Sequence, residues 1–214
     1  MGAAAALTLA SCSSSPRVPD WQLDAKSALE RSQEAYLVGN GRVEAAEFAR
    51  ARSAVASTGR IDLLARVELA RCATRVASLV FEPCAGFEAI AQDAPAPERA
   101  YAFYLAGQPR VADLALLPES QRAVAAASGA PELKSIADPL SRLVAAGVLL
   151  QTRRADPRTI SEAIETSSAQ GWRRPLLAWL GVQAQRAETA GDADEAARIR
   201  RRIALTGEGS LPGP

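Results

Sequence analysis

Prolines beside acidic residues divide the second half of this chain into short segments. There are five such sites: Pro97-Glu98, Pro118-Glu119, Pro131-Glu132, Asp138-Pro139 and Asp156-Pro157. Proline suits the first position of a helix because the amide hydrogen that it lacks has no partner there, and a nearby carboxylate offsets the positive end of the helix dipole. An aspartate before the proline also supplies an N-cap. We therefore predict a helix at each site and two more before the C-terminus. The predicted helices cover 97–106, 118–128, 131–137, 139–153, 157–169, 175–190 and 193–206.

Apolar side chains in the first half of the chain recur at three- and four-residue intervals, the spacing of one helix face. They predict helices over about 21–36, 43–58, 61–79 and 87–91. A short glycine-containing connection follows the first helix, so the first two should pack as an antiparallel hairpin. The third is apolar around more than half of its circumference and should be the central, most buried helix.

The composition favours helices throughout. Alanine, the strongest helix former, is abundant, whereas aromatic residues make up 5% of the chain and β-branched residues are sparse. The expected fold class is therefore all-α, built from stacked antiparallel helical hairpins. Residues 20–206 should form a single domain, with a subdivision near the Pro-rich linker 94–97 as the alternative. Residues 207–214 are rich in glycine and proline and are expected to form a disordered tail.

Two segments resemble degenerate tetratricopeptide repeats. Residues 28–56 contain Tyr36-Leu37-x-Gly39, Ala45, Phe48 and Ala51, and residues 176–205 contain Ala184, Ala187, Gly191, Ala196 and Ile203. Both segments have a small residue near the middle of the first helix, a glycine at the turn and an alanine early in the second helix. The resemblance implies a tetratricopeptide-like stack whose surface binds another protein or peptide. Because no strict period of about 34 residues connects the copies, an irregular helical array or α-solenoid is the alternative.

The N-terminus has the features of an export signal. An apolar run from Ala3 to Leu7 is followed by Leu9-Ala10-Ser11-Cys12, which resembles a bacterial lipobox. The resemblance implies that residues 1–11 form a lipoprotein signal peptide, that Cys12 carries the lipid anchor, and that 12–19 are a lipidated tether. The apolar run is far too short to span a bilayer, which needs about 20 residues.

The residues on either side of this motif indicate where the protein is located and where its chain begins. Ser13, rather than an acidic residue, follows the cysteine. By resemblance to Gram-negative lipoproteins, this implies a lipid-anchored position at the outer membrane, with the body in the periplasm. Only Met1-Gly2 precede the apolar run, and neither is positively charged. Because export signals begin with positive charge, we expect the true start to lie upstream of Met1.

The remaining cysteines, Cys72 and Cys84, are expected to form a disulfide. A periplasmic address permits disulfides, and setting Cys12 aside leaves an even pair. Bridging them requires the chain to turn straight back along the third helix, so that the two Cα atoms come within about 7 Å. Five residues can span the ~12 Å of helix involved. Two buried free thiols are the alternative, and no metal site is expected because no histidine or further cysteine completes a tetrahedron.

The composition also removes several function classes. A formal net charge of +1 gives no electrostatic bias toward nucleic acid. The chain has no histidine, which removes Ser-His-Asp and Cys-His nucleophilic schemes, and no phosphate-binding glycine loop, so no cofactor is expected. Two carboxylate pairs one turn apart, Glu44 with Glu47 and Glu162 with Glu165, have a spacing that a glycosidase could use. Such pairs are also typical of solvated helix faces.

Arginine side chains concentrate near the C-terminus, in Arg198-Ile199-Arg200-Arg201-Arg202. Arg198, Arg201 and Arg202 share one helix face and form a candidate partner-binding surface. The same pattern is typical of a solvated helix end, where cations offset the dipole and pair with acids one turn earlier. The aromatic residues at 101, 103, 104, 172 and 179 are expected in the core, or as anchors for a partner where they line a groove.

Together these patterns favour a lipid-anchored periplasmic helical scaffold or adaptor that binds another cell-envelope protein or peptide. The membrane is expected to be contacted through the lipid, and nucleic acid is not an expected partner. A small-ligand-binding or structural lipoprotein is the alternative. We do not expect an enzyme, although a cell-wall-acting enzyme that uses Glu or Asp stays open as a further reading.

Overall fold

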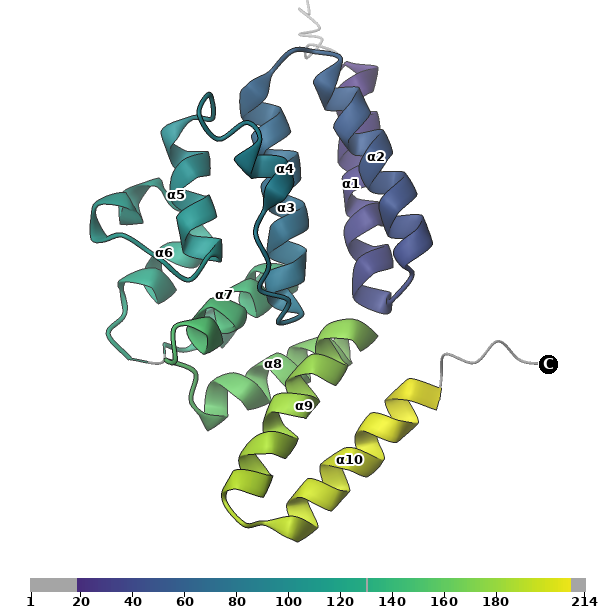
Figure 1. Ribbon diagram of the computed structural model, residues 1–214, viewed down its shortest axis with the longest axis vertical. Coiled ribbons are helices and arrows are strands. Elements are labelled where there is room, and N and C mark those ends of the chain that lie inside the picture. Colours follow the sequence, from purple (N-terminus) through teal and green to yellow (C-terminus); the bar gives the residue numbers. More distant parts are fainter. Residues whose placement is uncertain (1–18, 130, 209–214) are drawn as a thin grey trace, which may run out of the picture.

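The computed structural model describes residues 19–129 and 131–208, and every regular element within them is a helix (Figure 1). The all-α fold class is therefore confirmed, and the helices pack against one another as an array. The predicted signal peptide 1–11, Cys12 and the tether up to residue 18 lie outside the described residues, as does the predicted tail from residue 209 onward.

The described chain begins with a helical hairpin. α1 (Asp20–Val38) and α2 (Gly41–Ala56) are joined by Gly39 and Asn40. Gly39 has a φ of 94°, a left-handed conformation that glycine adopts without steric cost. The Asn40 side chain caps α2, because it accepts a hydrogen bond from the Val43 amide at 3.2 Å. The two helices pack closely against each other, as the short connection predicts.

α3 (Ile61–Ala77) occupies the centre of the molecule. Figure 1 shows it between the α1–α2 hairpin and α5, and it packs against α1, α2, α5 and α7. Its buried residues point to several neighbours rather than to one; they are Leu64, Ala65, Val67, Glu68, Leu69, Ala73, Thr74, Val76 and Ala77. The predicted central position of this helix is confirmed.

The segment after α3 does not continue the hairpin pattern. It holds the short helix α4 (Ala85–Glu88), then α5 (Ala96–Leu105), the 3-10 helix η1 (Val111–Leu116), α6 (Glu119–Ala126) and the 3-10 helix η2 (Leu133–Ser135). α5 and α6 lie on the side of α3 that faces away from the α1–α2 hairpin (Figure 1). The array is therefore irregular in its middle.

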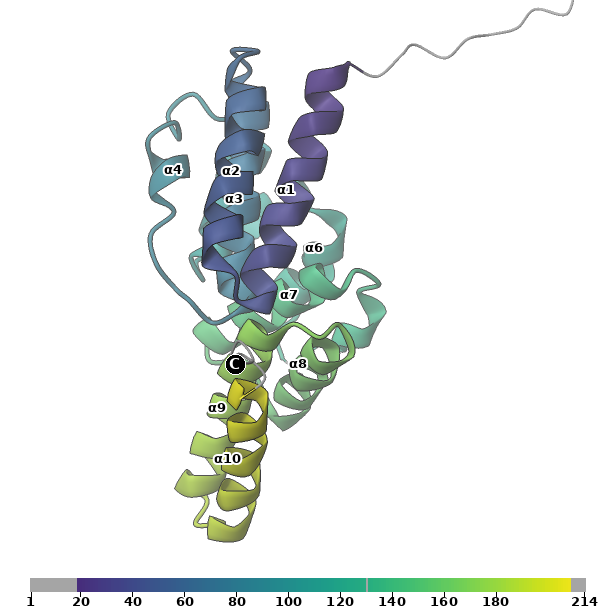
Figure 2. The same cartoon turned by 90° about the vertical axis from the view of Figure 1, so that its right-hand side faces the viewer.

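The last four helices form the second half of the array. They are α7 (Pro139–Gln151), α8 (Pro157–Ala169), α9 (Arg173–Thr189) and α10 (Ala193–Glu208). α7 and α8 cross below α3, and the α9–α10 hairpin projects away from the α1–α2 hairpin at the far end of the molecule (Figures 1 and 2). α10 continues two residues beyond the predicted end at 206, so residues 207 and 208, which were expected in a disordered tail, are helical instead.

The two Asp-Pro sites start helices as predicted. Asp138 accepts a hydrogen bond from the Ser141 amide at 2.7 Å, and Asp156 accepts one from the Thr159 amide at 2.7 Å. The Thr159 amide and hydroxyl hold the pKa of the Asp156 carboxyl below its usual value. In both cases proline is the first helical residue. Pro97 instead takes the second position of α5, and Pro118 the N-cap of α6, each one residue from its predicted place.

The predicted helix at 131–137 is wrong, since only the single turn η2 forms there. Tertiary contacts hold this segment in a non-helical conformation. The Leu133 amide donates to the Glu162 carboxylate of α8 at 3.2 Å, and the Leu133 side chain is fully buried. Arg142 of α7 donates to the Ile136 carbonyl at 2.7 Å and so ties the end of this segment to α7. These contacts outweigh the local preference of Pro131-Glu132.

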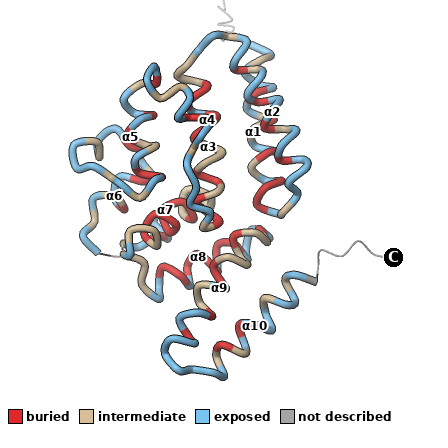
Figure 3. The backbone as a smooth tube through the Cα atoms, viewed as in Figure 1, coloured by how far each residue is buried: buried red, intermediate tan, exposed pale blue. Residues whose placement is uncertain are grey.

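α3, α7 and α9 meet at the C-terminal end of α3. Gly147 of α7 lies so close to α3 that a Cβ atom on it would be 2.4 Å from the backbone oxygen of Val76. The indole of Trp179 in α9, which is fully buried, donates a hydrogen bond to the Ala77 carbonyl at 3.2 Å. Figure 3 shows the buried positions concentrated where these helices converge, while the outer face of α10 is exposed. This junction joins the two halves of the array.

We expect the Gly147→Ala substitution to lower the free energy of unfolding by about 2–3 kcal/mol, because the added methyl group collides with a backbone atom that cannot rotate away. Gly181→Ala in the exposed middle of α9 is the matched control. A Cβ there meets nothing within 4 Å, so this substitution should raise the free energy of unfolding by about 0.5–1 kcal/mol. Urea denaturation of both variants measures the difference, and equal effects would contradict the close approach.

Candidate functional site

The chain doubles back after α3 and is pinned there by a disulfide. Leu79 has a φ of 60°, which turns the backbone, and the Val80 amide donates to the Arg75 carbonyl at 3.0 Å. The following residues then run back beside α3 until Cys84 reaches Cys72. The two cysteines form a disulfide with Cα atoms 5.9 Å apart. We call residues 79–84, which the disulfide ties to α3, the strap.

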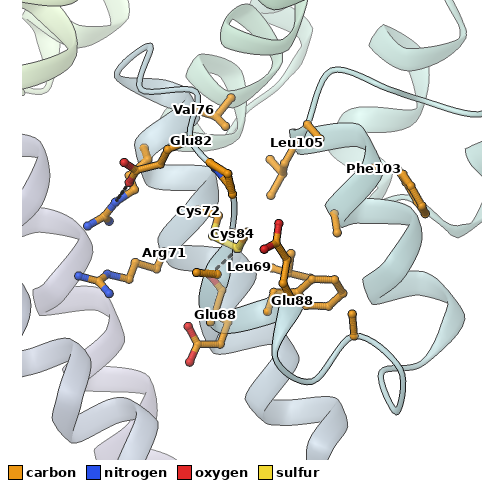
Figure 4. A pocket seen from close by; sticks show the side chains of 18 of the residues that line it. Glu68, Leu69, Arg71, Cys72, Val76, Glu82, Cys84, Glu88, Phe103 and Leu105 are labelled. Carbon is orange, nitrogen blue, oxygen red and sulfur yellow. Dashed lines mark hydrogen bonds and ion pairs between the residues drawn. A yellow bond between two sulfur atoms is a disulfide. The ribbon is translucent and has the colours of Figure 1, made fainter.

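A cavity of about 650 Å³ lies between α3, the strap with α4, and α5; we call it the disulfide cavity (Figure 4). The disulfide forms part of its wall. Its apolar lining includes Leu69, Val76, Phe81, Phe87, Ala102, Phe103 and Leu105. This volume is within the range of sites that hold a small molecule.

Two phenylalanines form exposed parts of the cavity wall. Phe81 in the strap is 42% exposed, and Phe103 on α5 is 38% exposed. The guanidinium of Arg110 lies 4.0 Å from the centre of the Phe103 ring, a cation–π contact that holds the ring in place. Exposed aromatic rings at a cavity are typical anchors for a binding partner.

A polar acceptor is also part of the wall of the disulfide cavity. Gln151, the last residue of α7, lines the cavity, and its side-chain oxygen is buried without a hydrogen-bond partner within the described residues. Gly107 leaves room for it, because a Cβ on Gly107 would lie 2.9 Å from that oxygen. Buried polar groups without a partner are uncommon in folded proteins. The oxygen could accept a hydrogen bond from a bound group.

Polar contacts fix the strap, α3 and α4 around the cavity. On the strap, Arg75 donates to Glu82 at 2.9 Å. Further along α3, the buried Glu68 accepts from Arg52 of α2 at 2.7 Å, which ties α3 to α2. Gly86 of α4 approaches Glu68 so closely that a Cβ would lie 2.0 Å from the carboxylate. Figure 4 shows the side chain of Glu88 near Cys84 and Leu105.

Comparisons with models of known protein families, with curated proteins and with solved structures find no match. In the part of the chain that the structure describes, no group of three or more metal-binding side chains comes together. Nor is any helix among those residues long and apolar enough to cross a membrane.

The two predicted carboxylate pairs do not line the disulfide cavity. Glu44 is buried and accepts from Arg71 at 2.8 Å, whereas Glu47 accepts from Arg31 at 2.9 Å. In the other pair, Glu162 accepts from Arg158 at 2.9 Å and Glu165 lies near Lys134. The acids of each pair are therefore held by separate cations, and the Arg31 hydrogen bond lowers the pKa of Glu47.

The candidate arginines of α10 lie far from this cavity. Arg198 pairs with Glu195, three residues earlier. Arg201 and Arg202 are exposed and form no ion pair within the described residues. Figure 1 places α10 at the end of the molecule opposite to the α1–α2 hairpin. The structure therefore does not bring these arginines to the disulfide cavity.

Of the aromatic residues expected in the core or at a groove, some are buried and one lies at the surface. Tyr104 and Trp179 are fully buried, and Trp172 is nearly so. Phe103 lines the disulfide cavity instead. Phe81 and Gln151 were not expected as site residues. An aromatic residue two positions before Pro83 of the strap was the available signal for Phe81. The position of Gln151 depends on its packing against Gly107, which no local pattern indicates.

Removal of the disulfide should loosen the strap. We expect the Cys72→Ser/Cys84→Ser double variant to lose about 2–4 kcal/mol of unfolding free energy, because the unfolded chain gains the entropy of the opened loop. Urea denaturation measures the loss. Wild-type protein under a strong reductant should match the double variant. A loss below about 0.5 kcal/mol would contradict a stabilising role for the bridge.

Proposed function

We propose that the protein is a lipid-anchored periplasmic adaptor whose disulfide cavity receives an apolar side chain of another cell-envelope protein. The observation that carries this proposal is the pair of exposed phenylalanines at one cavity, Phe81 on the strap and Phe103 on α5. Large apolar side chains exposed together are costly in water. Burial of both by a partner would recover part of this cost.

The surroundings of the cavity suit an interface. Charged groups surround the aromatic pair, including the Arg75–Glu82 ion pair and the Arg110 that contacts Phe103. A polar rim around an apolar centre is the usual anatomy of a protein interface, where the rim excludes water and the centre supplies most of the binding energy. The buried oxygen of Gln151 adds an acceptor for one donor of the partner.

The proposed address rests on the lipobox resemblance at Cys12. Eight residues, 12–19, would then separate the lipid from α1, which begins at Asp20. Fully extended, they reach at most about 28 Å. The helical domain would therefore stay close to the membrane surface, where it could bind a partner protein of the cell envelope. No catalytic role is proposed, since separate cations hold the acids of each carboxylate pair.

Site-specific photo-crosslinking in cells tests the adaptor directly. A photoreactive amino acid in place of Phe103 should crosslink to one envelope protein. The same amino acid in place of Leu23, which is 54% exposed on α1, is the matched control and should not. The Phe81→Ser substitution should reduce the crosslink at position 103 by about tenfold, because the aromatic anchor is lost.

Two further outcomes bear on the proposal. A version exported by a cleavable signal, with Cys12→Ala, should lose most of the crosslink, because it is no longer held at the membrane. Equal crosslinking from positions 23 and 103, or none from either, would contradict an adaptor that uses this cavity.

The cavity volume of about 650 Å³ favours one second candidate, a protein that binds a small apolar molecule. Extraction of the purified protein with organic solvent, followed by mass spectrometry, separates the two. A stoichiometric compound that is lost in the Phe103→Ser variant would support the ligand-binding function. Protein without any such compound, together with the crosslink from position 103, supports the adaptor.

A further inference from the structure

A second cavity, of about 750 Å³, lies on another face of the α3–α5 pair and extends to the start of α7; we call it the α7 cavity. Leu69 of α3 lines both cavities, but the other residues of α3 and α5 that line this one do not line the first. Leu69, Ala73, Leu140 and Val144 give it apolar walls. It is independent of the partner proposed for the disulfide cavity.

The α7 cavity contains a buried carboxylate with a hydrogen-bond partner for only one of its two oxygens. Glu98 of α5 is 6% exposed and lines the cavity. One of its oxygens, Oε1, accepts a hydrogen bond from Arg66 Nε at 2.7 Å. The other, Oε2, is buried and has no hydrogen-bond partner within the described residues. A buried carboxylate oxygen without a donor is costly, so this atom is suited to a donor supplied from outside the chain.

A tyrosine hydroxyl one turn further along α5 is also available. Tyr101 lines the α7 cavity, and its hydroxyl forms no hydrogen bond within the described part of the chain. The neighbouring Tyr104, whose ring lies 6.0 Å away, differs because its hydroxyl donates to Gln121 at 2.7 Å. Burial, and to a lesser extent the Asp138 carboxylate, raise the pKa of Tyr101 above its usual value, so its hydroxyl stays protonated.

The charges around the α7 cavity favour a cationic guest. Glu30, Glu98 and Asp138 contribute carboxylates, and Arg66 and Arg122 contribute guanidinium groups. Both arginines already have partners: Arg66 binds Glu98, and Arg122 donates to the Leu117 carbonyl at 2.9 Å. Asp138 uses one oxygen to cap α7. The lining therefore holds one more carboxylate than guanidinium groups, and the apolar walls beside them suit a short alkyl chain.

We infer that the α7 cavity binds an alkylammonium group, with the ammonium at Glu98 Oε2 and the Tyr101 hydroxyl and the alkyl chain against Leu69 and Val144. An ammonium carries three donors and a positive charge, which match the buried carboxylate oxygen. Such a group can come from a lysine side chain of a partner or from a free small amine. Both sources present the same chemistry to the cavity.

Calorimetric titration of the full mature chain with hexylamine tests this inference. At neutral pH hexylamine is protonated, and hexanol is the matched uncharged probe. Hexylamine should bind at least about tenfold more tightly than hexanol, since it alone supplies a charged donor. The Glu98→Gln substitution should weaken hexylamine binding by about tenfold or more and leave hexanol binding unchanged.

Glu162→Gln is the control for loss of a buried glutamate. Glu162 is 5% exposed and paired with Arg158, like Glu98 with Arg66, but it lines neither cavity. This variant should bind hexylamine as the wild type does. The Tyr101→Phe substitution keeps the ring and should weaken binding by a smaller factor, which provides a second test where Glu98→Gln fails to fold.

Two further probes separate the possible sources. Tighter binding of an Nα-acetylated lysine amide than of 1,6-diaminohexane would assign a lysine side chain, and the reverse order would assign a free amine; either order supports ammonium recognition. Binding of hexylamine no tighter than hexanol, or equal binding to the wild type and Glu98→Gln, would overturn the inference.

Discussion

The contact between α3 and α7 is the constraint on which the rest of the structure depends. Gly147 allows the two backbones to approach until only a hydrogen atom fits between its Cα and the Val76 carbonyl. Trp179 then reaches the Ala77 carbonyl and joins α9 to the same end of α3. Both cavities have α3 as a wall, so this junction also fixes their shape.

Buried glutamates set the spacing of the helices around α3. Arg71 of α3 binds Glu44 of α2, Arg52 of α2 binds Glu68 of α3, and Arg66 of α3 binds Glu98 of α5. In each pair the carboxylate is buried and the arginine reaches toward solvent. Removal of one partner would leave an uncompensated buried charge, which costs about 3–5 kcal/mol in general. The pairs therefore favour one arrangement of α2, α3 and α5 over others.

Local signals predicted most helices, because capping and apolar spacing depend on neighbouring residues. Asp138 and Asp156 cap their helices as expected. Where tertiary contacts decide, prediction failed: Leu133 packs in the core and its amide binds Glu162, and only the single turn η2 forms at 131–137. The residues of the two cavities could not be predicted from local patterns. Pro97-Glu98 indicates only that Glu98 is an acid in the first turn of a helix, because the burial of Glu98 follows from the packing of α3, α5 and α7.

Native-state hydrogen exchange tests the central role of the α3–α7 junction most directly. We predict that amides at 65–77 of α3 and 143–151 of α7 exchange last, only through global unfolding, because both helices are buried at the junction. Amides of α10 and of the strap should exchange earlier, through local opening. Exchange from α3 as fast as from α10 would contradict the account.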